Sequence, residues 1–171
     1  PEYMKIEIRR AEITERQIVR NLMELYQHDF SELDGTDMDE HGQYGYDDLD
    51  SFWVNPTWSA YVMKVDSKWA GFVLTNDEVH IQGNTRAIVE FFVVRKYRRQ
   101  GLGRKAAETI MTMFPAKWEV CVIEENPAAR KFWETLINTV WPGRHQLAVL
   151  DNEQWQGPVF PVDTHVTAPL V

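Results

Sequence analysis

Hydrophobic and polar residues follow two spacings along the chain, and each spacing predicts a different element. Alternating residues and short apolar runs are typical of strands, whereas apolar residues three and four positions apart are typical of helices. Strands are expected at residues 5–9, 58–65, 68–75, 86–95, 118–123, 146–150 and 158–162. Helices are expected at residues 14–28, 47–53, 101–114 and 127–137.

Turn and capping residues mark the ends of several of these elements. Thr14-Glu15-Arg16-Gln17 matches a capping box, in which Thr14 caps the helix and Gln17 reaches back. Asp66-Ser67 is a tight-turn signal between two strands, and Asn126-Pro127 is a strong helix start. The apolar run from Ala87 to Val94 is typical of a strand covered on both faces, and a second strand pair is expected to lead into it.

Together these elements predict a single α+β domain over residues 1–171 with a mixed sheet. Residues 1–3 precede the first Met and are expected to be a remnant of cloning, and residues 163–171 are expected to be a loosely held tail. Hydrophobic residues make up 44% of the chain, enough for a real core.

Composition narrows the classes of site and partner. The lone Cys121 excludes an internal disulfide and a zinc site built from cysteines, is expected to be a core thiol, and favours a reducing cytoplasmic setting. The scattered His and Asp residues show no ligand spacing, so no metal site is expected. No apolar run approaches the roughly 20 residues that span a bilayer, so no membrane partner is expected.

Charge is distributed unevenly, although the net charge is only −8. Ten carboxylates and no Lys or Arg lie between Arg20 and Lys64. Such a field repels nucleic acid and attracts cations, which favours a cationic partner. The plainer interpretation is a solvated acidic loop that keeps the protein soluble, and both interpretations stay open.

The most informative segment leads from the buried strand into a helix through Arg98-Arg99-Gln100-Gly101-Leu102-Gly103. Glycine permits left-handed backbone and a close approach, so successive N–H groups can point at one anion at the start of the helix. Arg98, Arg99 and Arg104 add positive charge. These features predict a diphosphate site, with an ordinary glycine-rich turn as the alternative. The segment matches neither a nucleotide P-loop nor the Rossmann fingerprint.

This segment resembles the R/Q-x-x-G-x-G/A motif of the GNAT N-acetyltransferases. The residues Asn126-Pro127-Ala128-Ala129-Arg130-Lys131-Phe132-Trp133 are similar to the next motif of that family, N-x-x-A-x-x-[LF]-Y. The two motifs cover roughly residues 86–137, and the whole chain looks like a group of small bacterial predicted acetyltransferases without an assigned acceptor. The resemblance implies a GNAT-like, mostly antiparallel sheet of about six or seven strands with a splayed central parallel pair, flanked by about four helices.

The resemblance also implies a co-substrate, acetyl-CoA, and the residues that bind it. Backbone amides of the turn would bind the pyrophosphate, and the pantetheine arm would lie against the end of the preceding strand. A backbone N–H there would stabilise the oxyanion, typically by about 3 kcal/mol. The implied cofactor-binding residues are Val93, Val94, Arg95, Arg98, Arg99, Gln100, Gly101, Leu102, Gly103, Arg104, Asn126 and Phe132.

Glu90 is the candidate base, because it is the only ionisable residue between Ala87 and Val94. An alkyl amine is neutral in only about one molecule per thousand at pH 7, so a positioned carboxylate would help it attack. Polyamine acetyltransferases, which the run resembles, carry their acidic residue one position earlier, where this chain has Val89. A structural role for Glu90 therefore remains the alternative.

The family's usual tyrosine, which protonates the leaving thiolate, is replaced by Trp133. Indole N–H only donates, so Trp133 either hydrogen-bonds the sulfur or packs in the core. Tyr44 or Tyr46 could substitute from residues 41–46, which form either an acceptor-recognition loop or an ordinary solvent loop. His28-Asp29 is interpreted as a helix end rather than a catalytic dyad.

The resemblance thus implies an N-acetyltransferase that moves an acetyl group from acetyl-CoA to a primary amine by direct attack in a ternary complex. Residues 21–63, which contain the ten carboxylates and are called the acidic window here, favour a small cationic acceptor. Acetylation of a protein or peptide amine and a non-catalytic acyl-CoA-binding module are the alternatives. Family members are often dimers, so the resemblance also allows a homodimer.

Overall fold

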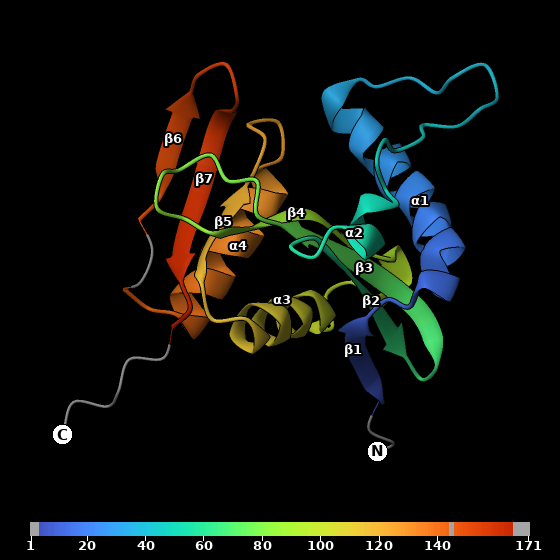
Figure 1. The fold of residues 1–171 in the computed structure, drawn as a ribbon, viewed down its shortest axis with the longest axis horizontal. Helices are drawn as coiled ribbons and strands as arrows, with labels where there is room; N and C mark the ends of the chain where they lie inside the picture. Colours follow the sequence, from blue (N-terminus) through green and yellow to red (C-terminus); the bar gives the residue numbers. More distant parts are fainter. Residues whose placement is uncertain (1–3, 144–145, 166–171) are drawn as a thin grey trace. The chain divides into compact units, whose positions relative to one another are not determined.

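The computed structural model describes residues 4–143 and 146–165 (Figure 1). The chain divides into two compact units, of which the first comprises Pro1–Asn76 with Glu90–Gly103 and the second Asp77–Val89 with Arg104–Val171. A single domain over the whole chain stays a prediction. The expected cloning remnant, residues 1–3, and residues 166–171 of the expected tail lie outside the described residues.

Among the described residues, seven strands form the sheet, in the order β1-β2-β3-β4-β5-β7-β6. Their bounds are β1 Ile6–Arg10, β2 Ser59–Val65, β3 Lys68–Asn76, β4 Arg86–Val93, β5 Lys117–Cys121, β6 Ala148–Asp151 and β7 Gln156–Asp163. The pairs β1–β2, β2–β3, β5–β7 and β6–β7 are antiparallel, and β4–β5 is parallel. Arg86, Ala87 and Ile88 of β4 pair with Trp118, Glu119 and Val120 of β5. The mixed sheet with one parallel pair confirms the predicted fold class.

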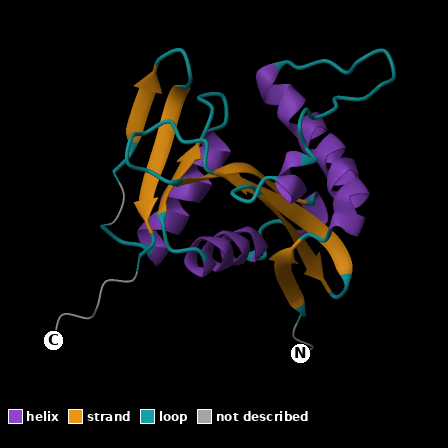
Figure 2. Cartoon of the chain, in the orientation of Figure 1, coloured by secondary structure: helices purple, strands orange, loops and turns teal. Residues whose placement is uncertain are grey.

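The helices lie close to where the apolar stripes predict them (Figure 2). Within the described residues the α-helices are α1 Arg16–Asp34, α2 Ser51–Val54, α3 Leu102–Met113 and α4 Pro127–Val140, with short 3₁₀ helices η1 Ile13–Glu15 and η2 Arg95–Tyr97. The Asn126 side chain accepts a hydrogen bond from the N–H of Ala129 at 3.0 Å, which confirms the predicted start of α4.

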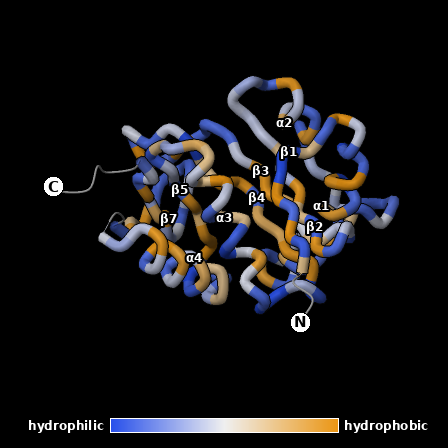
Figure 3. The backbone as a smooth tube through the Cα atoms, turned by 90° about the horizontal axis from the view of Figure 1, so that it is seen from below, coloured by the Kyte–Doolittle hydropathy of each residue, from blue (hydrophilic) through white to orange (hydrophobic). Residues whose placement is uncertain are grey.

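In the first unit, α1 packs on β3, and α2 packs on both β2 and β3. Hydrophobic residues concentrate in these strands (Figure 3), and Tyr26 of α1 lies edge-on to Phe72 of β3 with ring centroids 5.9 Å apart. The hairpin turn has left-handed backbone at both Asp66 and Ser67, with φ of 48° and 66°. This is the geometry of a type I′ turn, which matches the right-handed twist of the strands and confirms the prediction.

Two predictions about α1 are wrong. The helix runs to Asp34 rather than His28, because Gly35 supplies a left-handed cap with φ 75° and donates its N–H to the carbonyl of Ser31 at 2.9 Å. The residues that form the capping box are also Glu12 and Glu15, and not Thr14 and Gln17 as predicted. The carboxylate of Glu15 accepts the N–H of Glu12 at 2.8 Å and binds Arg9 through both oxygens, at 2.7 and 2.9 Å.

In the second unit, α4 packs on β7. The second strand pair expected before β4 does not form, since residues 77–85 are turns and loop. Figure 1 shows this green segment passing beside β5, and the N–H of Thr85 donates to the carbonyl of Lys117 at 2.8 Å. Thr164 follows β7 and is buried, with its hydroxyl donating to the carbonyl of Met111 at 2.9 Å. No helix among the described residues is long and apolar enough to cross a membrane.

Candidate functional site

Residues 98–101, between η2 and α3, form a turn that lies neither within a strand nor within a helix. Arg99 and Gly101 adopt positive φ, 60° and 79°, and residues 99–101 are exposed. A Cβ added at Gly101 would meet nothing within 4 Å, so the backbone conformation rather than crowding requires glycine there. The first N–H groups of α3, which lack intrahelical partners, begin at Leu102. The turn can therefore bind an anion.

The end of β4 offers backbone groups of two kinds. The N–H of Val94 donates to the carbonyl of Ala70 at 2.8 Å, so it is bonded within the sheet. Successive residues of a strand direct their backbone groups to opposite sides, so the N–H of Val93 points away from β3. The carbonyl of Val93 accepts from Nε of Arg98 at 2.7 Å. Among the backbone groups predicted to meet the pantetheine arm, the N–H of Val93 therefore has the more suitable direction.

Asp29 of α1 binds two arginines from the segment between β4 and α3. Both Oδ atoms of Asp29 accept hydrogen bonds, from Nη2 of Arg95 and Nη2 of Arg98, each at 2.6 Å. Burial opposes ionisation of Asp29, but these two guanidinium groups hold the pKa of its carboxyl below its usual value. His28-Asp29 thus lies inside α1 and is not the helix end that the sequence suggested. The contact fixes Arg98 beside the turn.

Glu90, the predicted base, lies on β4 beside the hydroxyls of two tyrosines. Its Oε1 lies 3.4 Å from the hydroxyl of Tyr46, and Tyr26 of α1 also hydrogen-bonds the carboxyl. Burial raises the pKa of Glu90 to about 7, against the lowering effect of the two tyrosine hydroxyls. Alternation along β4 puts Glu90 on the face of Phe92, whose ring lies 5.8 Å from that of Tyr26. A carboxyl half ionised near neutral pH can exchange protons with a bound group.

The loop between α1 and α2 is hydrogen-bonded to α1. The N–H groups of Tyr44 and Gly45 donate to the two carboxylate oxygens of Glu24, each at 2.9 Å. The hydroxyl of Tyr44 contacts Oγ of Ser31 at 3.2 Å, whereas that of Tyr46 reaches Glu90. The structure therefore brings Tyr46, and not Tyr44, to the candidate base.

Four predicted site residues belong to the second unit, namely Arg104, Asn126, Phe132 and Trp133, whereas Gly103 is the last residue of the first unit. Arg104 is exposed in the first turn of α3. Asn126 caps α4 through its side-chain oxygen, and Trp133 is only 4% exposed. The rings of Phe132 and Trp133 pack edge-on with centroids 5.2 Å apart. Burial of Trp133 favours its packing interpretation over a direct contact with sulfur.

Sequence reasoning missed a polar cluster in the second unit. Glu119 of β5 is fully buried, and its oxygens accept hydrogen bonds from the backbone of His80 and Ile81 and from the side chain of Asn84, at 2.8–3.1 Å. Cys121 lies beside it, and burial together with Glu119 raises the pKa of the thiol to about 12. A charged residue inside an apolar strand was the available signal, but its partners lie almost forty residues earlier in the chain.

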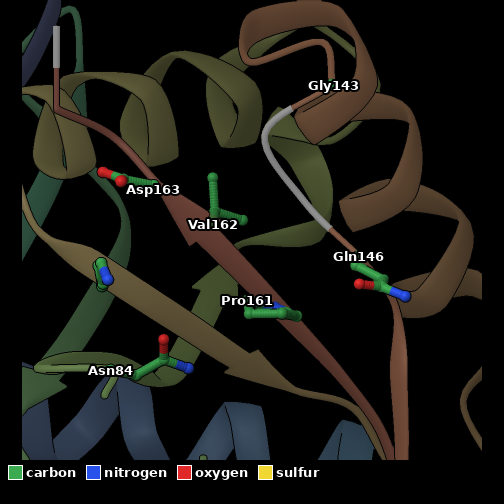
Figure 4. A pocket seen from close by; sticks show the side chains of 7 residues that line it. Asn84, Gly143, Gln146, Pro161, Val162 and Asp163 are labelled. Atoms are coloured by element: carbon green, nitrogen blue, oxygen red, sulfur yellow. The ribbon is translucent and has the colours of Figure 1, made fainter. Parts of the chain in front are cut away.

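The second unit also has a surface hollow (Figure 4). It is lined by Asn84, Lys117, Gly143, Gln146, Pro161, Val162 and Asp163. None of these residues belongs to the set predicted to bind acetyl-CoA or to transfer protons. The hollow therefore adds nothing to the candidate site.

Comparisons with known proteins support this interpretation. The model of the Acetyltransferase (GNAT) family matches residues 19–136. No curated protein matches the chain. Among solved structures, an acetyltransferase from Thermus thermophilus is 14% identical, with a TM-score of 0.68 and coverage of 92% of this chain and 97% of that one.

Two further structures share the fold. The PaiA N-acetyltransferase from Thermoplasma acidophilum, in complex with coenzyme A, is 14% identical, with a TM-score of 0.63 and coverage of 93% and 99%. AAC(6')-Iy, in complex with the bisubstrate analogue CoA-S-monomethyl-acetylneamine, is 14% identical, with a TM-score of 0.58 and coverage of 77% and 89%. The family model matches well over half of the length of this chain. The chain therefore belongs to the GNAT family and is an acetyl-CoA-dependent N-acetyltransferase.

Proposed function

We propose that this enzyme acetylates a primary amine of a small cationic molecule, with Glu90 as the base. The observation that carries the proposal is the carboxyl of Glu90, whose pKa burial raises to about 7 and which Tyr46 and Tyr26 hydrogen-bond. A base is most effective when its pKa lies near the working pH. Glu90 therefore has the protonation behaviour that amine acetylation needs.

The reaction is direct attack in a ternary complex. The ammonium form of the acceptor gives one proton to the ionised carboxylate of Glu90, and the nitrogen lone pair that this frees forms a bond to the thioester carbonyl carbon of acetyl-CoA, whose C=O electron pair moves to oxygen. The C=O bond then re-forms as the C–S bond breaks, and the thiolate leaves with the electron pair of that bond. The second proton passes from nitrogen through water to the thiolate, and Glu90 releases its proton to solvent. A CoA thiol has a pKa near that of cysteine, about 8.5, so no dedicated acid is required. This accommodates the buried Trp133 in place of a tyrosine.

Acetyl-CoA is held, in this proposal, by the turn and the end of β4. The backbone of the exposed residues 99–101 and the first amides of α3 receive the pyrophosphate, with Arg98 close by. The N–H of Val93 is the donor for the pantetheine arm or the oxyanion, because that of Val94 is already bonded to Ala70. Asn126 and Phe132 stay candidates for further contacts.

The acidic window supports a cationic acceptor. Some of its carboxylates have structural partners, namely Glu24 with the loop backbone and Asp29 with the arginines. Others, such as Asp37 and Glu40, are exposed and can attract a cation. AAC(6')-Iy binds a bisubstrate analogue made from acetylneamine, and that similarity of fold is compatible with a small amine acceptor here.

The test is a screen of polyamines, aminoglycosides, amino-acid amides and peptides that measures release of the CoA thiol. Glu90→Gln is expected to lower kcat for the best acceptor by about 100-fold or more, and to remove the rise of activity with pH around 7. Glu32→Gln, which removes an exposed carboxylate of α1, is the matched control and should leave both unchanged.

Three outcomes would contradict parts of the proposal. Turnover with peptides alone would assign a protein or peptide amine as the acceptor. Tight CoA binding without thiol release on any acceptor would identify a non-catalytic module. An unchanged pH profile in Glu90→Gln would exclude Glu90 as the base.

A further inference from the structure

Three potential metal ligands of different chemistry meet in the second unit. Glu119 and Cys121 lie two residues apart on β5, so their side chains share one face of the strand. His80 comes from the segment between β3 and β4 and lies against that face. The three ligand atoms, one each of nitrogen, oxygen and sulfur, lie within 4.8 Å of one another.

The distances within this group match one face of a tetrahedral zinc site. Nδ1 of His80 lies 3.1 Å from Oε2 of Glu119 and 3.5 Å from Sγ of Cys121, and Sγ lies 3.7 Å from Oε2. Zinc binds nitrogen and oxygen at about 2.0 Å and thiolate at about 2.3 Å, so tetrahedral neighbours lie roughly 3.3–3.5 Å apart. Shifts of a few tenths of an ångström would complete the geometry.

The surroundings of Glu119 resemble those of a metal-binding carboxylate. Its Oε1 accepts hydrogen bonds from the N–H of Ile81 and the amide of Asn84, and its Oε2 accepts the N–H of His80. Such outer hydrogen bonds fix the orientation of a ligating carboxylate. These hydrogen bonds offset part of the cost of burying a carboxylate that is 0% exposed, and a cation bound beside it would offset more.

Charge and access also suit a divalent ion. A carboxylate and a thiolate carry two negative charges, which a zinc ion neutralises, and imidazole is neutral. The side chain of His80 is 27% exposed and Cys121 is half-buried, so an ion can reach the ligands from solvent. The absence of other cysteines excludes a cysteine-rich site but not this mixed one.

We propose that Nδ1 of His80, a carboxylate oxygen of Glu119 and Sγ of Cys121 bind a zinc ion, with water as the fourth ligand. Binding displaces the thiol proton of Cys121 into solvent and uses the unprotonated Nδ1 of neutral His80. The ion ties the segment 77–85 to β5. The site is separate from the acetyl-transfer proposal, and neither depends on the other.

The experiment uses the untagged, chelator-treated chain of 171 residues. Calorimetric titration with zinc chloride is expected to show one ion per chain, and titration with cobalt(II) should give a thiolate-to-cobalt absorption band. Cys121→Ser should abolish that band and, like His80→Ala, weaken zinc binding at least tenfold. The matched control is His41→Ala, since His41 also has a carboxylate neighbour, Glu40, at 3.4 Å, but is exposed. Circular dichroism verifies that each variant is folded.

A measurement on the unmodified chain covers the case in which a variant fails to fold. One equivalent of zinc should slow alkylation of Cys121, the only cysteine of the chain, at least tenfold in folded protein. Unchanged alkylation, no stoichiometric binding, or equal zinc affinity in a folded Cys121→Ser variant would overturn the proposal.

Discussion

Glu90 shows how much a single side chain depends on its neighbours. Its position in an apolar run identified it in the sequence, because an ionisable group there must have partners or a raised pKa. The partners could not be predicted. Tyr44 and Tyr46 are equivalent in the sequence, and only the folded loop directs one hydroxyl to Ser31 and the other to Glu90. Glu119 was missed for a related reason, since its donors come from a distant segment.

Removing the hydroxyl of Tyr46 should make Glu90 a base that works at higher pH. That hydroxyl lowers the pKa of Glu90, so in Tyr46→Phe the pKa should rise further above about 7. A hydrogen bond contributes about 0.5–1.5 kcal/mol, which corresponds to a shift of roughly 0.4–1 pH unit. Because the ionised carboxylate is the active form, the rising limb of the pH–rate profile should move upward by that amount. Tyr44→Phe is the control and should not move it.

At the scale of elements, spacing predicted most helices and strands but not all of their ends. The extension of α1 beyond His28 depends on the left-handed cap at Gly35, and a glycine in an acidic loop has many possible roles. A second strand pair was expected to lead into β4, but residues 77–85 instead make hydrogen bonds to the backbone of β5 and to its Glu119 side chain. These bonds satisfy the backbone without a ladder, and no local pattern reveals them.

The start of α1 should lose stability when Glu15 is neutralised. The hydrogen bonds from Arg9 lower the pKa of Glu15 to about 2, although burial opposes them. A carboxyl with a lowered folded-state pKa stabilises the fold above its ordinary value of 4.5 and loses that effect as pH falls toward 2. Since Arg9 is about a third exposed, we expect Glu15→Gln to lower the free energy of unfolding by about 1–2 kcal/mol at pH 7.

Urea unfolding between pH 7 and pH 2 measures this effect. The difference between Glu15→Gln and the unmodified chain should shrink below pH 4 and be nearly absent at pH 2. Glu7→Gln removes a more exposed carboxylate from the same guanidinium, and we expect it to cost at most about 0.5 kcal/mol. An equal loss in both variants, or a difference that is independent of pH, would contradict the assignment.

For the whole molecule, two short motifs predicted the fold and the reaction better than the composition did. The mixed sheet followed from the order of strand and helix patterns, while the parallel pairing of β4 with β5 followed only from the family resemblance. The division into two units was not visible in the sequence, because β4 contributes residues to both. The predicted cofactor residues are likewise distributed over both units, so their shared role rests on the family rather than on one local pattern.

The most direct test of this account is calorimetric titration of CoA into the unmodified chain, Gly101→Ala and Gly83→Ala. Gly101 and Gly83 both have positive φ and open space for a Cβ, but only Gly101 lies in the turn before α3. Alanine in left-handed backbone costs roughly 1–2 kcal/mol, so the turn in Gly101→Ala would adopt another conformation. Binding of CoA would then have to restore the left-handed conformation, and that cost would weaken the affinity.

We therefore predict that CoA binds the unmodified chain and Gly83→Ala equally, one molecule per chain, and binds Gly101→Ala about tenfold more weakly. Absence of heat with the unmodified chain, or equal affinity in all three proteins, would show that the turn is not the phosphate-binding element.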